Sequence, residues 1–315
     1  MPGGLYKAGG TAVEEKQARL QRLKREKDAV ILAHYYVPED VQEAADYVGD
    51  SFYLSQVAQR VEAKTIVLCG VRFMGESAKI LNPQKTVLLP DAAADCPMAH
   101  MADPARVRQV KAQYPDAAVV CYVNSTAELK MLADVCVTSS NALAVCRALP
   151  NRRIFFIPDQ HLAHFIAAKL PEKEFLFNDG CCVVHDAIRA GDVQETMRRH
   201  PGAKVLVHPE CRSEVTALAD YVGSTAGILT FAQQDDANAY IVCTDRGIFY
   251  ELRRRCPEKT FFLVEGCSQT CTDMKKVTLD KVIAALEANA PQVTLPEAVL
   301  QAAKTPLERM LALSR

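Results

Sequence analysis

The sequence has no apolar stretch long enough to span a bilayer, and its Gly-rich first ten residues lack the apolar segment of a secretory signal. It also has almost no net charge, because 37 basic side chains stand against 38 acidic ones and leave a formal charge of −1. Such a balance provides no dominant basic surface for nucleic acid or for an anionic membrane. We therefore expect a soluble globular protein of the cytoplasm that binds neither.

Three common local motifs are missing as well. There is no G-x-x-x-x-G-K-S/T segment, and Gly70 and Gly75 do not form a G-x-G-x-x-G turn, which argues against P-loop and dinucleotide sites. No C-x-x-C pair occurs among the 12 cysteines, so a local zinc motif is absent. In a reducing compartment cysteines are thiols or metal ligands rather than disulfides. Those in apolar runs are expected in the core: Cys69, Cys121, Cys136, Cys146 and Cys243.

An internal repeat organises the chain. Three apolar strand sequences align, and each ends in polar residues: 30–36, 118–124 and 204–210. Strand and helix patterns alternate after each of them, which predicts parallel sheets with helices on both faces. The sequence therefore predicts an α/β fold of three repeated Rossmann-like αβα units around a pseudo-threefold axis, with a central active site beyond the carboxyl ends of the strands.

The repeat also predicts the boundaries of the units. A tail and a surface helix with Leu20 and Leu23 on its apolar stripe come first, and two helices rich in leucine come last. The expected division is 1–28 for the tail and first helix, 29–115, 116–202 and 203–278 for the three units, and 279–315 for the C-terminal helices.

One cysteine follows a strand in each unit. Cys96, Cys182 and Cys271 are 86 and 89 residues apart and lie in loops rich in Gly, Asp and Ser. Three converging thiolates suit an iron–sulfur cluster or zinc rather than magnesium or calcium. A [4Fe-4S] cluster on three cysteines leaves one iron open, and an open iron is a Lewis acid suited to dehydration or condensation. The repeat alone leaves Cys267 as an alternative to Cys271, and three buried thiols as the structural alternative.

Polar side chains occupy equivalent places in the three units. Three strands end in acid, base and amide groups: His34, Tyr36, Tyr122, Asn124, His208 and Glu210. Three helices are expected to open with a hydroxyl: Ser51, Ser139 and Thr225. One such residue alone is more often a structural cap. A ring of hydroxyls at helix N-termini instead favours carboxylate or phosphate binding, with His, Tyr and Glu as acids and bases.

The sequence carries a set of distinctive motifs: Gly49-Asp50-Ser51, Phe73-Met74-Gly75-Glu76, Tyr122-Val123-Asn124-Ser125-Thr126, Thr138-Ser139-Ser140-Asn141-Ala142, Gly180-x-Cys182-x-Val184-His185 and His208-Pro209-Glu210-Cys211. With these it resembles the quinolinate synthase family, iron–sulfur enzymes that make quinolinic acid for NAD biosynthesis. The resemblance covers nearly the whole chain. It departs from the family before the second cysteine loop, where a tryptophan is usual and this chain has none.

The resemblance implies a [4Fe-4S] cluster on Cys96, Cys182 and Cys271, and so favours Cys271 over Cys267. It implies that iminoaspartate condenses with dihydroxyacetone phosphate and loses phosphate and water, and that an aspartate-oxidising enzyme supplies the imine. Proton transfer would fall to Tyr36, His208 and Glu210. By motif, substrate carboxylates and phosphate would be bound by His34, Ser51, Tyr122, Asn124, Ser139, His208, Glu210 and Thr225.

Two alternatives stay open at this point. Another [4Fe-4S]-dependent hydro-lyase acting on a small dicarboxylate would share the open iron and the hydroxyl ring, but would not need a phosphate-bearing substrate. A metal or redox sensor would share the cysteines. A sensor needs no receptor for a substrate, so the polar ring argues against it.

Overall fold

The computed structural model describes residues 8–314, and the predicted tail at 1–7 lies outside them. Within this range, twelve strands form three parallel sheets. The first contains β1 (Ala29–His34), β2 (Tyr47–Gly49), β3 (Thr65–Cys69) and β4 (Thr86–Leu88). The second contains β5 (Ala118–Tyr122), β6 (Val135–Val137), β7 (Arg153–Ile157) and β8 (Glu174–Phe177). The third contains β9 (Lys204–Val207), β10 (Tyr221–Val222), β11 (Ala239–Cys243) and β12 (Thr260–Leu263).

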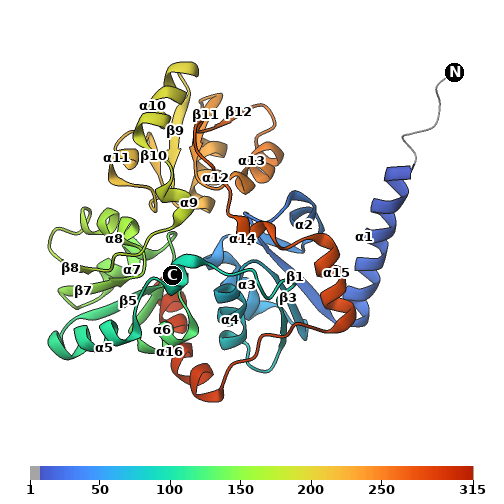
Figure 1. Cartoon of the computed structure of the whole chain (residues 1–315), viewed down its shortest axis with the longest axis horizontal. Coiled ribbons are helices and arrows are strands. Elements are labelled where there is room, and N and C mark those ends of the chain that lie inside the picture. The colour runs from blue at the N-terminus through green and yellow to red at the C-terminus, as the bar shows by residue number, and fades with distance from the viewer. Residues whose placement is uncertain (1–7, 315) are drawn as a thin grey trace.

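The three sheets share one strand order. In each, the first strand of the unit lies between the second and the third: β2-β1-β3-β4, β6-β5-β7-β8 and β10-β9-β11-β12. The strands β1, β5 and β9 are apolar and almost completely buried, as expected where helices flank a parallel sheet. Figure 1 shows three lobes, one for each sheet, around a common centre. The predicted fold of three repeated Rossmann-like units is confirmed.

Short helices connect the strands in every unit. The first unit has α2 (Glu39–Ala44), α3 (Ser51–Arg60), α4 (Arg72–Leu81) and the 3-10 helix η1 (Pro97–His100), and α5 (Pro104–Gln113) leads to the second. The second has α6 (Ala127–Leu132), α7 (Ala142–Ala148), α8 (Gln160–Ala167), α9 (Val183–Asp186) and α10 (Ala190–Arg199). The third has α11 (Ser213–Thr216), α12 (Thr225–Gln234), η2 (Arg246–Ile248), α13 (Phe249–Arg255) and α14 (Thr272–Lys275).

Three further helices pack outside the repeats. The first, α1 (Ala8–Glu26), buries Leu20 and Leu23 as predicted and lies against α15 (Leu279–Ala288). The last, α16 (Glu297–Leu313), contacts α4, α6 and β6, so it joins the first and second units. None of the helices within residues 8–314 is both long and apolar enough to cross a membrane. The cysteines predicted to lie in the core are buried there: Cys69, Cys121, Cys136, Cys146 and Cys243.

One local prediction is wrong. Ser51 and Thr225 begin α3 and α12, as expected, whereas Ser139 lies in a turn ahead of α7. The side chain of Asn141 explains the difference, because its Oδ1 accepts a hydrogen bond from the Thr138 N–H at 2.6 Å and closes that turn. The hydroxyl of Ser139 is therefore presented by a loop rather than by the first turn of a helix.

Candidate active site

A pocket between the three units collects the residues predicted from the repeat. Each unit contributes four of them to its lining: His34, Tyr36, Ser51 and Cys96, then Tyr122, Asn124, Ser139 and Cys182, then His208, Glu210, Thr225 and Cys271. Parallel strands bring their carboxyl ends to one edge of each sheet, and these edges face the common centre. Among residues 8–314, no lysine or arginine belongs to the lining.

The three predicted ligand cysteines occupy the same local position. Cys96, Cys182 and Cys271 directly precede the short helices η1, α9 and α14. Burial raises the pKa of all three thiols, to about 12 for Cys96, and backbone N–H groups of the following helix offset this in part. A buried thiolate at these positions therefore requires a positively charged group beside it.

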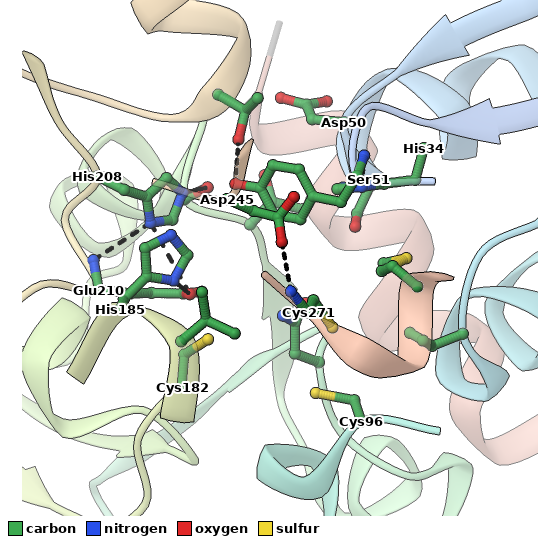
Figure 2. A pocket seen from close by; sticks show the side chains of 18 of the residues that line it. His34, Asp50, Ser51, Cys96, Cys182, His185, His208, Glu210, Asp245 and Cys271 are labelled. Carbon is green, nitrogen blue, oxygen red and sulfur yellow. Dashed lines mark hydrogen bonds and ion pairs between the residues drawn. The ribbon is translucent and has the colours of Figure 1, made fainter. Parts of the chain in front are cut away.

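Figure 2 shows the three sulfur atoms on one side of the pocket, each carried by a separate segment of the chain. Among the described residues these sulfurs do not all lie within 4.8 Å of one another, whereas sulfurs around one tetrahedral zinc are about 3.8 Å apart. In this arrangement the three sulfurs are too far apart to bind one zinc ion together. Three soft thiol donors that line one pocket fit the [4Fe-4S] cluster that the resemblance implies.

Two buried carboxylates hold the second and third cysteine loops. Asp159 and Asp245 follow the equivalent strands β7 and β11, and neither is exposed to solvent. The Cys182 N–H donates to Asp159 Oδ2 at 3.0 Å, and the Cys271 N–H donates to Asp245 Oδ2 at 2.5 Å. Each carboxylate therefore fixes the backbone of a cysteine from a neighbouring loop of its own unit.

The first unit differs, because the residue equivalent to these two aspartates is Val71. There the Cys96 N–H donates to the carboxylate of the preceding residue, Asp95, at 2.8 Å. Asp159 and Asp245 are not among the site residues predicted from the sequence. Their signal is the strand alignment itself, because each lies two residues beyond the end of an aligned strand.

Two histidines of the pocket lining, His34 and His208, use the same ring nitrogen, Nδ1, to accept a hydrogen bond from the backbone. His34 Nδ1 accepts a hydrogen bond from the Tyr36 N–H at 3.1 Å, and His208 Nδ1 accepts one from the Glu210 N–H at 3.3 Å. A neutral ring that accepts at Nδ1 carries its proton on Nε2. Burial is the largest cause that lowers the pKa of both histidines, to about 3. Both rings are therefore neutral Nε2–H donors near pH 7.

A chain of short contacts crosses the pocket wall from the first unit to the second and third. The Tyr36 hydroxyl bonds to the hydroxyls of Thr225 and Thr244, each at 2.7 Å. Thr244 Oγ1 lies 2.8 Å from His185 Nε2, and His185 Nδ1 lies 2.8 Å from Glu210 Oε2. Tyr36 and Glu210 are thus connected through buried polar groups.

Acidic and basic groups of different strength stand beside each other here. Burial raises the pKa of Glu210, but His208, His185 and the Tyr122 hydroxyl outweigh that effect and leave it lowered. Burial raises the pKa of Tyr36 and Tyr122 well above the usual value for a phenol. A carboxylate and two neutral phenols therefore line the same cavity, which is the arrangement that acid–base chemistry needs.

Three buried polar atoms of the lining make no hydrogen bond to the described residues. One of them, His185 Nδ1, lies 2.8 Å from Glu210 Oε2. The other two are Asn124 Oδ1 and Glu210 Oε1. Buried polar atoms nearly always have partners, so this pair is available to a polar ligand. The lining also includes residues to which the sequence analysis gave no role: Asp50, Val71, Phe73, Thr138, Val184, His185, Asp245 and Met274. Five of these lie in the quoted motifs of the resemblance, namely Asp50, Phe73, Thr138, Val184 and His185, whereas Val71, Asp245 and Met274 lie in none of them.

Three parallel-sheet units that turn their strand ends toward one buried pocket of thiols, imidazoles, phenols and hydroxyls define an α/β enzyme with a central active site. Comparison with known proteins identifies its family. The family described as "Quinolinate synthetase A protein" matches residues 18–312. The chain belongs to the quinolinate synthase family.

Several bacterial relatives support this assignment. The chain is 46% identical over 292 residues to the quinolinate synthase of Clostridioides difficile (strain 630), which covers 93% of this chain and 96% of that protein. It is 44% identical over 296 residues to the quinolinate synthase of Fusobacterium nucleatum subsp. nucleatum, with 94% and 98% covered. For the quinolinate synthase of Aquifex aeolicus (strain VF5) the identity is 43% over 306 residues, with 96% and 95% covered. The hydro-lyase and sensor alternatives are not favoured.

Proposed function

We propose that this enzyme condenses iminoaspartate with dihydroxyacetone phosphate to form quinolinic acid, releasing phosphate and water. The observation that carries the proposal is that all twelve residues matched by motif line one pocket, although they come from three separate units. The imine would be supplied by an enzyme that oxidises aspartate.

Cys96, Cys182 and Cys271 would hold a [4Fe-4S] cluster. Their buried sulfurs are soft donors, and the backbone N–H groups of η1, α9 and α14 support the thiolate form. When bound, a cluster with three cysteine ligands supplies an iron with an open position that acts as a Lewis acid.

Uncharged donors would bind the substrate carboxylates and phosphate, because the described part of the chain contributes no lysine or arginine to the lining. Ser51 and Thr225 begin the ten-residue helices α3 and α12, where backbone N–H groups and the helix dipole favour an anion. Ser139 contributes a third hydroxyl from its loop. The remaining donors named for this role are His34, Tyr122, Asn124, His208 and Glu210, of which Glu210 accepts rather than donates.

Glu210 and Tyr36 would divide the proton transfers. Condensation and ring closure need protons removed from carbon and others delivered to leaving hydroxyl groups. Glu210 is the base, because its pKa is lowered and it is a carboxylate near pH 7. Tyr36 is the acid, because its phenol stays protonated, and Thr244 and His185 connect it to Glu210. His208 is a neutral ring with its proton on Nε2, which lies 3.2 Å from Ser139 Oγ, and it would orient substrate as a hydrogen-bond donor.

Iron and sulfide analysis with an anaerobic visible spectrum tests the cluster. The variants are Cys96→Ser, Cys182→Ser and Cys271→Ser, and Cys267→Ser is the matched control because it lies in the same loop as Cys271 and is also a free, partly buried thiol. About four irons per chain are expected in the wild type and the control, and fewer in each of the three variants. Zinc in place of iron, or three variants that match the wild type, would contradict the cluster.

Quinolinate formation tests the reaction. The loaded enzyme receives dihydroxyacetone phosphate and iminoaspartate generated in the assay, and quinolinate and phosphate should appear in equal amounts. A loaded enzyme that makes no quinolinate but dehydrates a phosphate-free dicarboxylate would instead support the hydro-lyase.

A further inference from the structure

A second group of metal-ligating side chains lies outside the pocket, beside the second cysteine loop. His161, Cys181 and Asp186 each offer one ligand atom, and the three atoms all lie within 4.8 Å of one another. They come from α8, from the loop before α9 and from the last residue of α9. None of them lines the central pocket. We propose that these three residues form a peripheral site for one thiophilic divalent cation, zinc in the first instance.

The donor set and its spacing suit zinc. One sulfur, one imidazole nitrogen and one carboxylate oxygen are all common zinc ligands, and a fourth position stays open for water. His161 Nε2 lies 2.8 Å from Asp186 Oδ1, whereas a nitrogen and an oxygen on one tetrahedral zinc are about 3.4 Å apart. Small side-chain rotations that lengthen this distance by about 0.6 Å would therefore admit the ion. Magnesium and calcium would not take the thiolate.

The charges of the site balance a divalent ion. Burial raises the pKa of Asp186, but hydrogen bonds from His161 and Arg212 outweigh it and leave the pKa lowered, so the carboxylate is ionised. Arg212 Nη2 donates to Asp186 Oδ2 at 2.8 Å and leaves Oδ1 facing His161. Its positive charge opposes a cation, while its hydrogen bond orients the ligand as supporting residues in metal sites do. A thiolate and a carboxylate together neutralise the ion.

The thiol separates this proposal from a metal-free alternative. His161, Asp186 and Arg212 alone would form an ordinary hydrogen-bonded link between the second and third units. Cys181 would have no role in such a link. Its sulfur takes part in no hydrogen bond within residues 8–314, and its N–H donates to Met101 Sδ. A metal site does require that sulfur.

A surface groove would give the ion access to the site, and binding of the ion would constrain α9. His161 and Arg212 line a surface groove of about 400 Å³ between α8 and α11, and the two potential ligands Asp186 and His161 have side chains 21% and 15% exposed. Asp186 is the last residue of α9, the one-turn helix that follows Cys182, and Cys181 lies two residues before the first residue of that helix. A bound ion would therefore tie the last residue of that helix to the loop before it.

X-ray absorption at the zinc edge tests the proposal on the iron-loaded enzyme, because it reports zinc without interference from iron. One zinc per chain is expected, with one sulfur neighbour at about 2.3 Å and nitrogen or oxygen neighbours at about 2.0–2.2 Å. Cys181→Ser should remove the sulfur neighbour and weaken zinc binding by at least about tenfold, the lower end of what loss of a supporting residue costs a metal site. His161→Gln should weaken it similarly, and the control Cys267→Ser should match the wild type.

Iron per chain, measured in the same samples, shows that the variants are folded and loaded. Equal zinc affinity in the wild type, Cys181→Ser and His161→Gln would overturn the proposal. So would zinc with three sulfur neighbours and loss of iron, because the ion would then have replaced the cluster. Absence of stoichiometric zinc binding by the wild type would overturn it as well.

Discussion

Replacing Asp159 by alanine should loosen the second cysteine loop. The fully buried carboxylate accepts the Leu162 N–H through Oδ1 at 2.7 Å, at the start of α8, and the Cys182 N–H through Oδ2 at 3.0 Å. Alanine removes both acceptors. Loss of a helix cap costs about 1 kcal/mol, and a buried donor without a partner costs about 1–3 kcal/mol. We therefore expect the free energy of unfolding of the metal-free protein to fall by about 2–4 kcal/mol.

Asparagine is the sharper probe of the same position. Asp159→Asn keeps the shape but replaces one accepting oxygen by a donor that faces an N–H group. It also removes the burial of a charge and the repulsion from Glu210, the two causes that raise the pKa of Asp159. The asparagine variant should consequently lose less stability than the alanine variant. Asp245 also accepts two N–H groups, from Gly247 and Cys271, but Lys275 lies 3.6 Å from its Oδ1, so Asp245→Asn should lose more stability than Asp159→Asn.

Urea unfolding of the metal-free proteins, followed by circular dichroism under reductant, measures the stability. Iron per chain after cluster assembly reports on the second cysteine loop, and Asp159→Ala should retain less iron than the wild type. An Asp159→Ala protein that unfolds at the wild-type urea concentration and retains the same iron would refute the idea that this carboxylate holds the loop of Cys182.

Three further predictions follow from the site. First, His34 and His208 have a folded pKa of about 3 against the usual 6.5, so only the unfolded chain takes up their protons as the pH falls; stability of the metal-free protein should be greatest above pH 6.5 and drop by about 2 kcal/mol per histidine at pH 5. Urea unfolding across this range should show a smaller drop in His208→Gln, and an unchanged slope would contradict the assignment. Second, Glu210→Gln should lower quinolinate turnover by about 10²-fold or more with iron content unchanged, because the base is lost while the cluster is not; full turnover would exclude Glu210 as the base. Third, Gly180→Ala should reduce iron retention and cost about 1–3 kcal/mol of stability, because a Cβ there would lie 2.7 Å from the Pro158 carbonyl oxygen and 2.8 Å from Met101 Cβ. Gly191→Ala is its control, since nothing lies within 4 Å of a Cβ at that position; equal effects of the two substitutions would show that the close approach at Gly180 does not matter.

The sequence by itself determined the repeated unit. Strands buried on both faces need continuous apolar runs, and these runs at β1, β5 and β9 recur in the chain with the same polar endings. The repeat placed one cysteine in each unit, and parallel strands bring the equivalent ends of each sheet to one edge. Local capping also follows from the sequence, because Asp103 accepts a hydrogen bond from the Ala105 N–H at the start of α5, whose first residue is proline.

Only the tertiary structure decided which side chains touch across the units. The contacts of Tyr36 with Thr244 and of His185 with Glu210 join residues 208 and 25 positions apart, and they depend on how three sheets pack rather than on any local pattern. The same holds for the group of His161, Cys181 and Asp186, which no repeat register predicts. Ser139 lost its expected helix start to a side-chain hydrogen bond from one neighbour in the turn. Strand and helix formation follows from short-range periodicity, whereas the direction of each side chain in the pocket is fixed by packing between units.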